Sequence, residues 1–232
     1  MKYKHIVVFG FPRSGTTLLY CMLQGSVVGY RFYPAEVTAN QAARRHPGVD
    51  KITKRPMDIK NVKLYSRTIP DIGFILCVRD PRSVLVSHVR GAFKVNWNYS
   101  THMTHSTGQA IEGKNEGLVD RHNFAVETLK YSPFICKYEE LVTDPEVMQH
   151  NIGEHFGLEY KDSFRNFNKH PISGRMTARL NRIRPVSTDR IMSWKDYPER
   201  IYEQFDACRK LFRIVKYWGY EENNSWFREM YK

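Results

Sequence analysis

The sequence predicts an α/β fold of three layers, in which helices cover both faces of a central, mainly parallel β-sheet. Short apolar runs alternate along the chain with stretches whose apolar residues recur at helical spacing. One run, Phe74–Val78, is apolar throughout, which is typical of a strand buried on both faces of a parallel sheet. We therefore expect right-handed β-α-β units within a single domain, residues 1–232.

The first strand is predicted at His5–Phe9, and a glycine-rich turn connects it to a helix predicted from Thr16 to about Gln24. A strand, a glycine-rich turn and a helix in this order form a phosphate cradle. The backbone N–H groups of the turn point inward, and the helix N-terminus adds about half a positive charge. This arrangement indicates a P-loop NTPase-like fold.

The glycine-rich turn departs from the ATP-binding P-loop pattern at one position. Gly10 and Gly15 have the expected spacing and Thr17 fills the Ser/Thr position, but Thr16 stands where that pattern has lysine. Arg13 is the only cation of the turn. The turn therefore favours a phosphorylated donor other than ATP-Mg.

The remaining elements follow in the order that a parallel sheet requires. Four basic residues, Arg13, Lys54, Arg79 and Lys137, lie at or just beyond predicted strand ends, where ligands of such sheets bind. The predicted elements after the first helix are a helix 34–45, strands 51–53 and 74–78, a helix from Pro81 through Val84, Leu85, Val89 and Phe93, a polar lid-like loop 94–117, a helix 118–129, a strand 134–136, a helical stretch 138–156 broken near Asp144, an irregular basic region 157–190, and a helical end 197–218.

Composition limits the class of protein. No apolar run approaches the roughly 18 residues of a membrane span, and the first strand begins too early to leave room for a signal peptide. The four cysteines form no CxxC pair, which argues against a zinc site and a disulfide framework. We expect a soluble, cytoplasmic protein.

The chain has a net charge of +12, and its basic residues are unevenly distributed along the sequence. Residues 174–190 carry five arginines against one acidic residue, Asp189, and such a stretch attracts polyanions. No aromatic residue is interleaved to stack on bases, so an anionic donor or acceptor is favoured over nucleic acid. A solvated basic face or a nucleic-acid patch is the alternative.

A second phosphate site is suggested after the buried strand. Arg79 leaves that strand, Asp80 and Pro81 have the pattern of a helix start, and Ser87 is expected two turns into the helix. A guanidinium and a hydroxyl so placed could bind a second phosphate. The alternative, in which Asp80 is only a cap and the arginines are solvated, is equally compatible with this segment alone.

These motifs together resemble those of the sulfotransferase superfamily. Arg13–Thr17 resembles its 5′-phosphosulfate loop, and Arg79–Ser87 resembles its 3′-phosphate motif. Thr53–Lys60 is similar to a strand end of tyrosylprotein sulfotransferases, and Lys137–Pro145 resembles a Tyr-Glu-Asp-Leu-Val segment of bacterial and Golgi members. A weaker likeness covers residues 186–197, and the resemblance is closest to the tyrosylprotein and carbohydrate branches.

The resemblance implies 3′-phosphoadenosine 5′-phosphosulfate (PAPS) as donor, with adenosine 3′,5′-bisphosphate as product. Lys54 would lie beside the transferring group. The family places a basic residue before the tryptophan, where this chain has Ser193, so Lys195 or Arg190 would take its place. The donor-binding residues implied are Arg13, Ser14, Gly15, Thr16, Thr17, Arg79, Ser87, Tyr138, Ser187 and Lys195.

The expected chemistry is an in-line transfer to an acceptor hydroxyl without a metal. A sulfuryl group carries less negative charge than a phosphoryl group, so the fixed cations Arg13 and Lys54 could meet the developing charge. The resemblance implies a base shortly after the first helix, and Glu36 occupies that place, 23 positions after Arg13. A first-turn helix glutamate is the alternative role for Glu36, and the alternative bases are His46, His88, His102 and His105.

The acceptor is expected to be an anionic saccharide or an acidic, tyrosyl-type peptide, because the chain is basic and Lys54 lies in the tyrosylprotein-like motif. Two other functions remain open from the sequence. One is a P-loop kinase or nucleotide hydrolase, which Thr16 in the lysine position disfavours. The other is a non-catalytic polyanion-binding module that uses the basic stretch 174–190.

Overall fold

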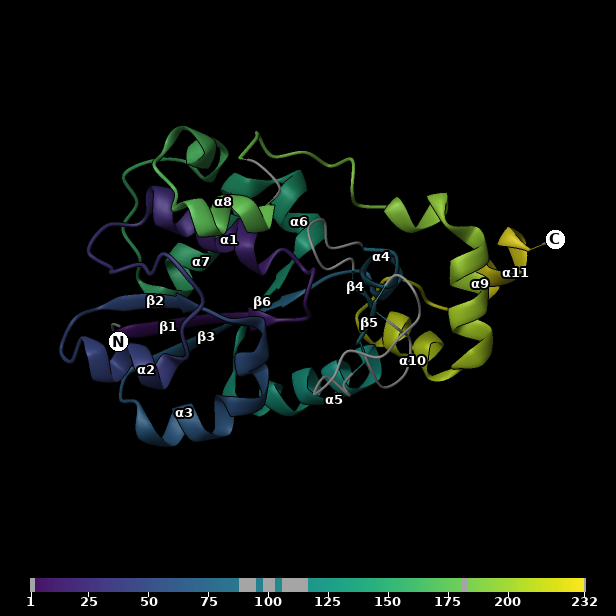
Figure 1. The fold of residues 1–232 in the computed structure, drawn as a ribbon, viewed down its shortest axis with the longest axis horizontal. Helices are drawn as coiled ribbons and strands as arrows, with labels where there is room; N and C mark the ends of the chain where they lie inside the picture. Colours follow the sequence, from purple (N-terminus) through teal and green to yellow (C-terminus); the bar gives the residue numbers. More distant parts are fainter. Residues whose placement is uncertain (1–2, 88–94, 98–102, 106–116, 181–182, 232) are drawn as a thin grey trace. The chain divides into compact units, whose positions relative to one another are not determined.

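The structure, a computed structural model, describes residues 3–87, 95–97, 103–105, 117–180 and 183–231 (Figure 1). They form two compact units. The sheet unit comprises Met1–Val78 and Ala125–Thr188, and the helical unit comprises Arg79–Phe124 and Asp189–Lys232.

A four-stranded parallel sheet forms the centre of the sheet unit. Its order is β2 (Lys51–Lys54), β1 (His5–Gly10), β3 (Ile72–Val78) and β6 (Phe134–Lys137). In register, Val8 of β1 lies opposite Lys54 on one side and Ile75 on the other. The four strands therefore end at one edge of the sheet, which is where predicted site residues follow them in the chain.

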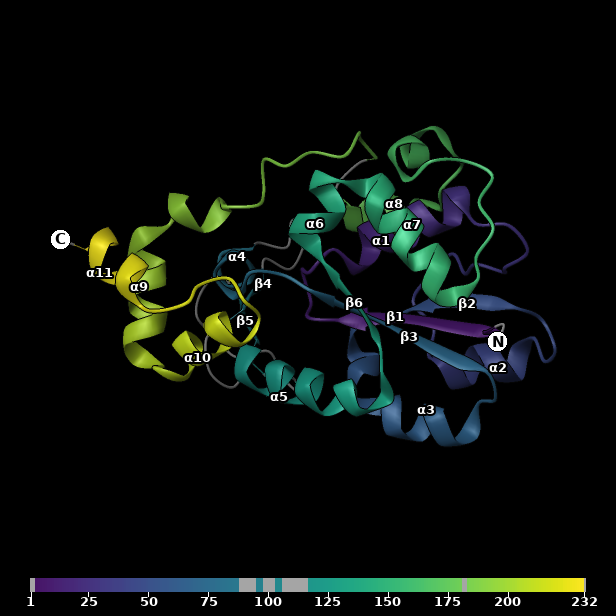
Figure 2. The same cartoon turned by 180° about the vertical axis from the view of Figure 1, so that it is seen from behind.

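Helices cover both faces of this sheet (Figures 1 and 2). On one face lie α1 (Thr16–Ser26), α6 (Tyr138–Thr143), α7 (Pro145–Phe156) and α8 (Gly174–Leu180), and on the other lie α2 (Ala39–Arg45) and α3 (Val62–Thr68). The three-layer prediction is thus confirmed. The chain leaves β1 toward β2 and then crosses back to β3, so right-handed crossovers in opposite directions place α1 and α3 on opposite faces.

The main core lies between the sheet and α1. All six residues of β1 are buried, and α1 buries a continuous run from Leu19 to Leu23. This helix is apolar on nearly all sides because it packs between the sheet and two later segments, the 3₁₀ turn η3 (Phe164–Lys169) and α8.

The helical unit surrounds the segment that follows β3. Its α4 (Pro81–Leu85) is accompanied by the short antiparallel strands β4 (Val95–Trp97) and β5 (Met103–His105). The chain end supplies η4 (Ser193–Asp196), α9 (Pro198–Ala207), α10 (Lys210–Tyr217) and α11 (Ser225–Met230), while α5 (Leu118–Thr128) spans the boundary between the two units. The helices α9 to α11 pack through an aromatic cluster of Phe205, Phe212, Trp226 and Phe227.

Two predicted helices have different bounds in the structure. The helix predicted from Pro34 begins only at Ala39, because Thr38 forms a capping box with Gln41 in which each side chain bonds the other's backbone N–H at 3.1 Å. The helix predicted from Pro81 ends at Leu85, so Ser87 lies beyond it instead of two turns inside it. Positions 88–94, which include Val89 and Phe93, lie outside the described residues.

Other segments contain more structure than expected. The predicted loop 94–117 contains β4 and β5, and the predicted irregular region 157–190 contains η3 and α8. The 3₁₀ segment η1 (Pro56–Asn61), α3, η4 and α11 were not predicted, whereas the break at Asp144 between α6 and α7 is confirmed. Among the described residues, no helix combines the length and apolarity that crossing a bilayer requires.

Candidate active site

The glycine-rich turn begins where β1 lies against β3. Gly10 has a φ of 146°, and a Cβ built at this position would lie 2.0 Å from the carbonyl oxygen of Cys77. The next residue, Phe11, donates its N–H to the same carbonyl at 3.2 Å. Position 10 therefore requires glycine on both conformational and steric grounds.

The apex of the turn is held by internal hydrogen bonds. Arg13 adopts a φ of 71°, a left-handed conformation that costs a residue with a side chain about 1–2 kcal/mol. The buried Ser14 Oγ donates to the carbonyls of Phe11 at 2.5 Å and Cys77 at 2.9 Å, and the Ser14 N–H donates to Phe11 at 3.1 Å. Ser14 thus braces the turn and keeps Arg13 in its strained conformation.

The turn ends at the N-terminus of α1. Gly15 is the N-cap, with a φ of 84°, and the first N–H groups of an α-helix, here those of Thr16 and Thr17, have no acceptor within the helix. A Cβ at Gly15 would lie 2.7 Å from Cδ2 of Tyr138, so the ring of Tyr138, which directly follows β6, packs against this end of the turn. The structure therefore brings Tyr138 and Gly15–Thr17 together.

Two further predicted residues, Lys54 and Glu36, meet Thr17 at the end of β2. Lys54 Nζ donates to Thr17 Oγ1 at 2.7 Å and to Glu36 Oε1 at 2.6 Å. The side chain of Lys54 is 2% exposed and that of Glu36 is 20% exposed. A buried ammonium thus links the first turn of α1, the strand end and the segment before α2, with one carboxylate oxygen balancing its charge.

The position of Glu36 excludes one of the two interpretations of that residue. Because α2 begins at Ala39 with Thr38 as its N-cap, Glu36 precedes the helix. The alternative of a first-turn glutamate stabilised by the helix dipole is therefore wrong for this helix.

The second predicted phosphate site lies in the helical unit. Arg79 is buried, and its Nη2 donates to the carbonyl of Arg190 at 2.5 Å. Ser83 Oγ donates to the carbonyl of Ile191 at 3.0 Å. These bonds place the segment with the weaker likeness beside the Arg79 segment.

The other residues of these two segments are more exposed. Ser87 and Ser187 are half-buried, whereas Arg190 and Lys195 are exposed. Lys195 Nζ lies 5.7 Å from the centre of the Trp194 ring. Either cation is thus open to solvent in the region where the resemblance implies a basic residue.

The histidines offered as alternative bases are placed only in part. His46 follows α2, where its Nδ1 lies 3.0 Å from Tyr33 Oη; burial lowers its pKa, and nearby cations such as Arg31 add to this. His88 and His102 lie outside the described residues, and only the backbone of His105 is described, in β5.

The structure adds a buried carboxylate to which the sequence analysis assigned no role. Asp58 is 0% exposed, accepts a hydrogen bond from Tyr65 Oη at 3.0 Å and lies 3.4 Å from Arg55 Nη1. Burial raises the pKa of Asp58. Its place four residues after Lys54 was the available signal, but its burial depends on η1 and α3, which the sequence did not reveal.

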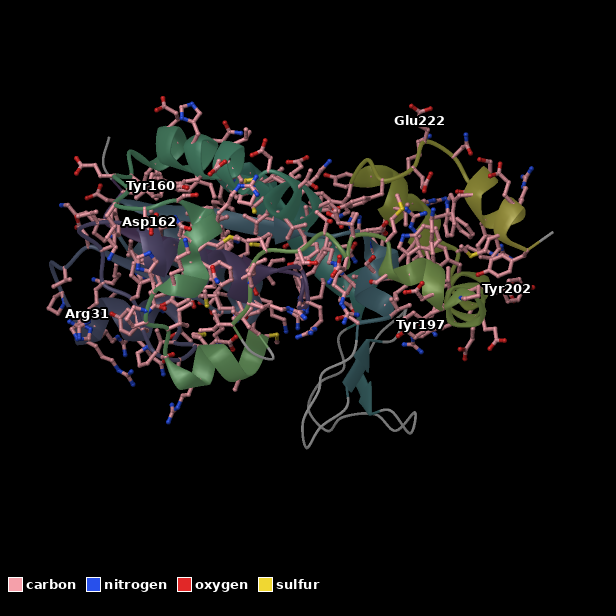
Figure 3. The ribbon with its side chains drawn as sticks, turned by 90° about the horizontal axis from the view of Figure 1, so that it is seen from above. Arg31, Tyr160, Asp162, Tyr197, Tyr202 and Glu222 are labelled. Carbon is pink, nitrogen blue, oxygen red and sulfur yellow. The ribbon has the colours of Figure 1, made fainter. Side chains whose placement is uncertain are left out.

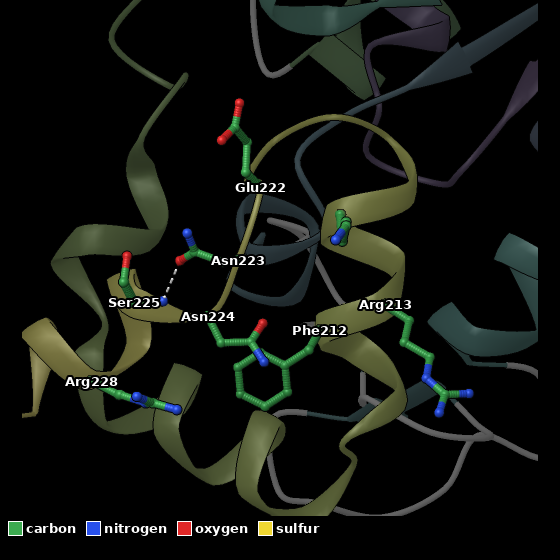
Figure 4. Close-up of a pocket in the computed structure, with 8 residues that line it drawn as sticks. Phe212, Arg213, Glu222, Asn223, Asn224, Ser225 and Arg228 are labelled. Carbon is green, nitrogen blue, oxygen red and sulfur yellow. Dashed lines mark hydrogen bonds between the residues drawn. The ribbon is translucent and has the colours of Figure 1, made fainter.

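A pocket of about 620 Å³ opens between α10 and the loop that leads to α11 (Figure 4). None of the predicted site residues lines it. Its walls carry three cations, Arg213, Lys216 and Arg228, and one carboxylate, Glu222. Within the described ranges, no group of three or more His, Cys, Asp or Glu side chains is arranged to hold a metal ion.

Two solved structures resemble this fold over most of the chain. A sulfotransferase domain from the curacin biosynthetic pathway has a TM-score of 0.58 at 15% identity, covering 89% of this chain and 98% of that one. A sulfotransferase domain from the Synechococcus PCC 7002 olefin synthase has a TM-score of 0.59 at 14% identity, covering 95% and 97%. No curated protein matches this sequence.

The sequence itself matches a family model over more than half of its length. That model, described as the sulfotransferase family, matches residues 28–162, a range that contains Glu36, Lys54, Arg79 and Tyr138. The two solved domains share the parallel sheet and the P-loop NTPase-like arrangement described above. The chain therefore belongs to the sulfotransferase family.

Proposed function

We propose that the protein transfers a sulfuryl group from PAPS to a hydroxyl of its acceptor. Membership of the sulfotransferase family supports sulfuryl transfer. The observation that carries the proposal for this chain is the buried Lys54, which bonds both Thr17, in the first turn of α1, and Glu36. One cation is thus fixed between a phosphate cradle and a carboxylate.

The donor would be held at both of its phosphates. At the 5′ end, Arg13 and the first N–H groups of α1 would bind the phosphosulfate, while Tyr138 contacts the nucleotide. The contact between Tyr138 and Gly15 supports the role of Tyr138. Because position 15 has no side chain, the ring of Tyr138 packs directly against the turn that would hold the phosphosulfate. The N–H of Ser14 already bonds Phe11, so we assign Ser14 a bracing role.

The 3′-phosphate would be bound by Arg79 and Ser87. Burial of the Arg79 guanidinium, which strengthens charge-assisted hydrogen bonds, supports this role. We assign Ser187 and Lys195 to the same donor site, with Lys195 or Arg190 supplying the cation that the family places before the tryptophan.

The chain's residues would act together during transfer. Glu36 accepts the proton of the acceptor hydroxyl while the acceptor oxygen bonds to sulfur and the bond from sulfur to the 5′-phosphate oxygen breaks. Lys54 and Arg13 stabilise the charge that develops on the leaving phosphate and the sulfuryl oxygens. Because these cations are fixed before the reaction, we propose an in-line transfer that needs no metal.

The acceptor that we propose is an anionic saccharide or an acidic, tyrosyl-type peptide. The net charge of +12 supports an acidic molecule, since a basic surface raises the local concentration of anions. The hydroxyl that it presents must reach Glu36, which is one-fifth exposed.

A thermal-shift experiment tests the donor. We expect adenosine 3′,5′-bisphosphate to raise the melting temperature by more than ATP-Mg does, because it carries the 3′-phosphate for which Arg79 and Ser87 are proposed. A ligand at 100 times its Kd stabilises the folded protein by about 2.7 kcal/mol. Equal stabilisation by both nucleotides, with metal-dependent release of phosphate from ATP, would instead indicate a kinase or nucleotide hydrolase.

A transfer assay tests the reaction. Radiolabelled PAPS is incubated with panels of anionic saccharides and acidic tyrosine peptides, with and without EDTA. We expect labelled acceptor in one panel and no effect of EDTA. Binding of polyanions with a steep salt dependence, but no effect of PAPS, would instead indicate a non-catalytic module.

A further inference from the structure

Arg82 is an arginine of the 3′-phosphate motif whose side chain is almost completely buried, with 3% exposure. Its Nε and Nη2 donate to the two carboxylate oxygens of Asp80 at 3.0 and 2.8 Å, and its Nη1 donates to Glu221 Oε1 at 2.6 Å. Every guanidinium nitrogen is thus bonded to a carboxylate within the helical unit. Arg82 is therefore neither a solvated surface cation nor placed to bind a phosphate itself.

Two tryptophans complete the surroundings of this guanidinium. The Arg82 Cζ lies 4.0 Å from the ring centre of Trp194 in η4 and 4.5 Å from that of Trp226 in α11. Arginine stacks favourably on indole faces, and the planar group can do so while its edge bonds carboxylates. Arg82 therefore joins α4 to two segments from the end of the chain.

Neighbouring residues of the motif are attached to the same part of the chain. Arg79 and Ser83 donate to the carbonyls of Arg190 and Ile191. Arg200 Nε donates to the carbonyl of Leu85 at 2.9 Å, at the last residue of α4. The path of the chain from Arg79 toward Ser87 is thus held by residues 190–226.

We propose that Arg82 is a positioning residue for the 3′-phosphate site, and this rests on the donor role proposed for Arg79 and Ser87. Asp80 connects the Arg82 side chain to the start of α4, because the carboxylate that binds the guanidinium also accepts the Arg82 N–H at 2.9 Å and caps the helix. With Arg82 in place, α4 starts and ends at fixed points, so Arg79 before it and Ser87 after it keep their separation. Arg82 itself does not touch the donor.

Lysine cannot replace arginine in this role. It keeps the charge, but it lacks the planar fork that binds Asp80 through two nitrogens while Glu221 takes the third. A substitution by lysine therefore separates charge from geometry.

The test compares two nucleotides by calorimetry on the full chain. The Kd values of adenosine 3′,5′-bisphosphate and adenosine 5′-monophosphate are measured for the wild type, Arg82→Lys, Arg79→Ala and the double variant. We expect the wild type to prefer the bisphosphate, and Arg82→Lys to lose about tenfold or more of that preference with little change in the Kd of the monophosphate. The reason is that one lost charge-assisted bond to the 3′-phosphate, about 1.5–3 kcal/mol, changes the Kd by at least a factor of ten. In the double variant, Arg82→Lys should add little to Arg79→Ala.

Two further variants separate positioning from general stability. Tyr202, on α9 (Figure 3), is half exposed, and its ring stacks on that of Phe227 in the aromatic cluster, with the ring centres 5.7 Å apart. Tyr202→Leu should lower the melting temperature but keep the preference for the bisphosphate. If Arg82→Lys does not fold, Glu221→Gln, which keeps the shape and removes one carboxylate charge, should show a smaller loss of the same preference.

The outcomes distinguish the two proposals. A wild type that binds both nucleotides equally overturns the 3′-phosphate site and the role of Arg82 together. A wild-type preference that survives Arg82→Lys and Glu221→Gln overturns only the positioning role. An Arg82→Lys variant that loses affinity for both nucleotides to the same extent also overturns it, because it then differs in no way from a packing variant such as Tyr202→Leu.

Discussion

Lys54 is the residue on which the proposed chemistry depends most directly. We expect Lys54→Ala to lower kcat by about 10²–10³-fold, the usual loss when one preorganised charge-stabilising donor is removed. Glu36→Gln should lower kcat by about 10²–10⁴-fold, because it removes the proposed base. Both are measured as transfer from radiolabelled PAPS at saturating acceptor.

Lys4→Ala is the matched control for this prediction. Lys4 forms an ion pair with Asp71 at 3.3 Å in the same unit, but its side chain is 62% exposed, so its removal should leave kcat and stability nearly unchanged. Undiminished turnover in Lys54→Ala or in Glu36→Gln would remove the role assigned to that residue.

His5 provides a prediction about stability that is independent of the reaction. It is buried at the start of β1 with its Nε2 3.0 Å from Thr53 Oγ1, and burial, with a smaller effect of Lys51, lowers its pKa to about 3. The folded pKa of His5 lies below its unfolded value of about 6.5, so the unfolded chain binds the proton first. The stability that the neutral, buried His5 contributes is therefore present above pH 6.5 and is lost as the pH falls toward 3.

The free energy of unfolding should therefore decrease by up to about 1.4 kcal/mol per pH unit from this group in that range. Denaturant unfolding at a series of pH values measures it. His5→Gln, which keeps an amide near the Nε2 position, should flatten the slope, and the same substitution at the exposed His150 should not. An unchanged slope in His5→Gln would assign the acid sensitivity to other groups.

At the scale of single residues, the sequence predicted neighbours best where a short motif and its chemistry point to the same residues. Lys54, Glu36 and Thr17 were predicted from spacing and resemblance, and the structure brings them together. The burial of Arg82 was not predictable in the same way. Its partners Glu221 and Trp226 lie more than 130 positions away in the sequence, so only the folded chain shows them.

At the scale of elements, the strands were predicted best. Each predicted strand is present with its ends shifted by no more than two residues. For β1 and β3 the reason is that strands buried in a parallel sheet are apolar runs with sharp ends. Helix limits were less certain because competing caps are hard to rank. Pro34 has the pattern of a first helical residue, but the capping box of Thr38 and Gln41 satisfies two N–H groups at once and sets the start of α2 at Ala39.

This cap also contributes to the site. A helix starting at Pro34 would place Glu36 in a regular turn, with its backbone fixed by helical hydrogen bonds. The later start leaves Pro34 to Val37 outside any helix or strand, and Glu36 bonds Lys54 from this segment. The start of α2 at Ala39 therefore determines that the proposed base lies in the segment before the helix and not within it.

At the scale of the whole molecule, the chain passes between its two compact units three times, at Val78/Arg79, Phe124/Ala125 and Thr188/Asp189. No single cut therefore separates the sheet unit from the helical unit. We therefore propose that residues 1–232 act as one sulfotransferase domain.

The net charge of +12 leads to a last prediction, about the acceptor. At saturating PAPS, raising the ionic strength from about 0.05 to 0.3 M should lower kcat/KM for an anionic acceptor several-fold, because screening shortens the range over which a basic surface attracts it. A neutral acceptor with the same hydroxyl is the control and should show little change. Saturating donor is essential, since PAPS is itself an anion and its own salt dependence would otherwise be measured. An equal response of both acceptors would show that the basic surface does not select an anionic acceptor.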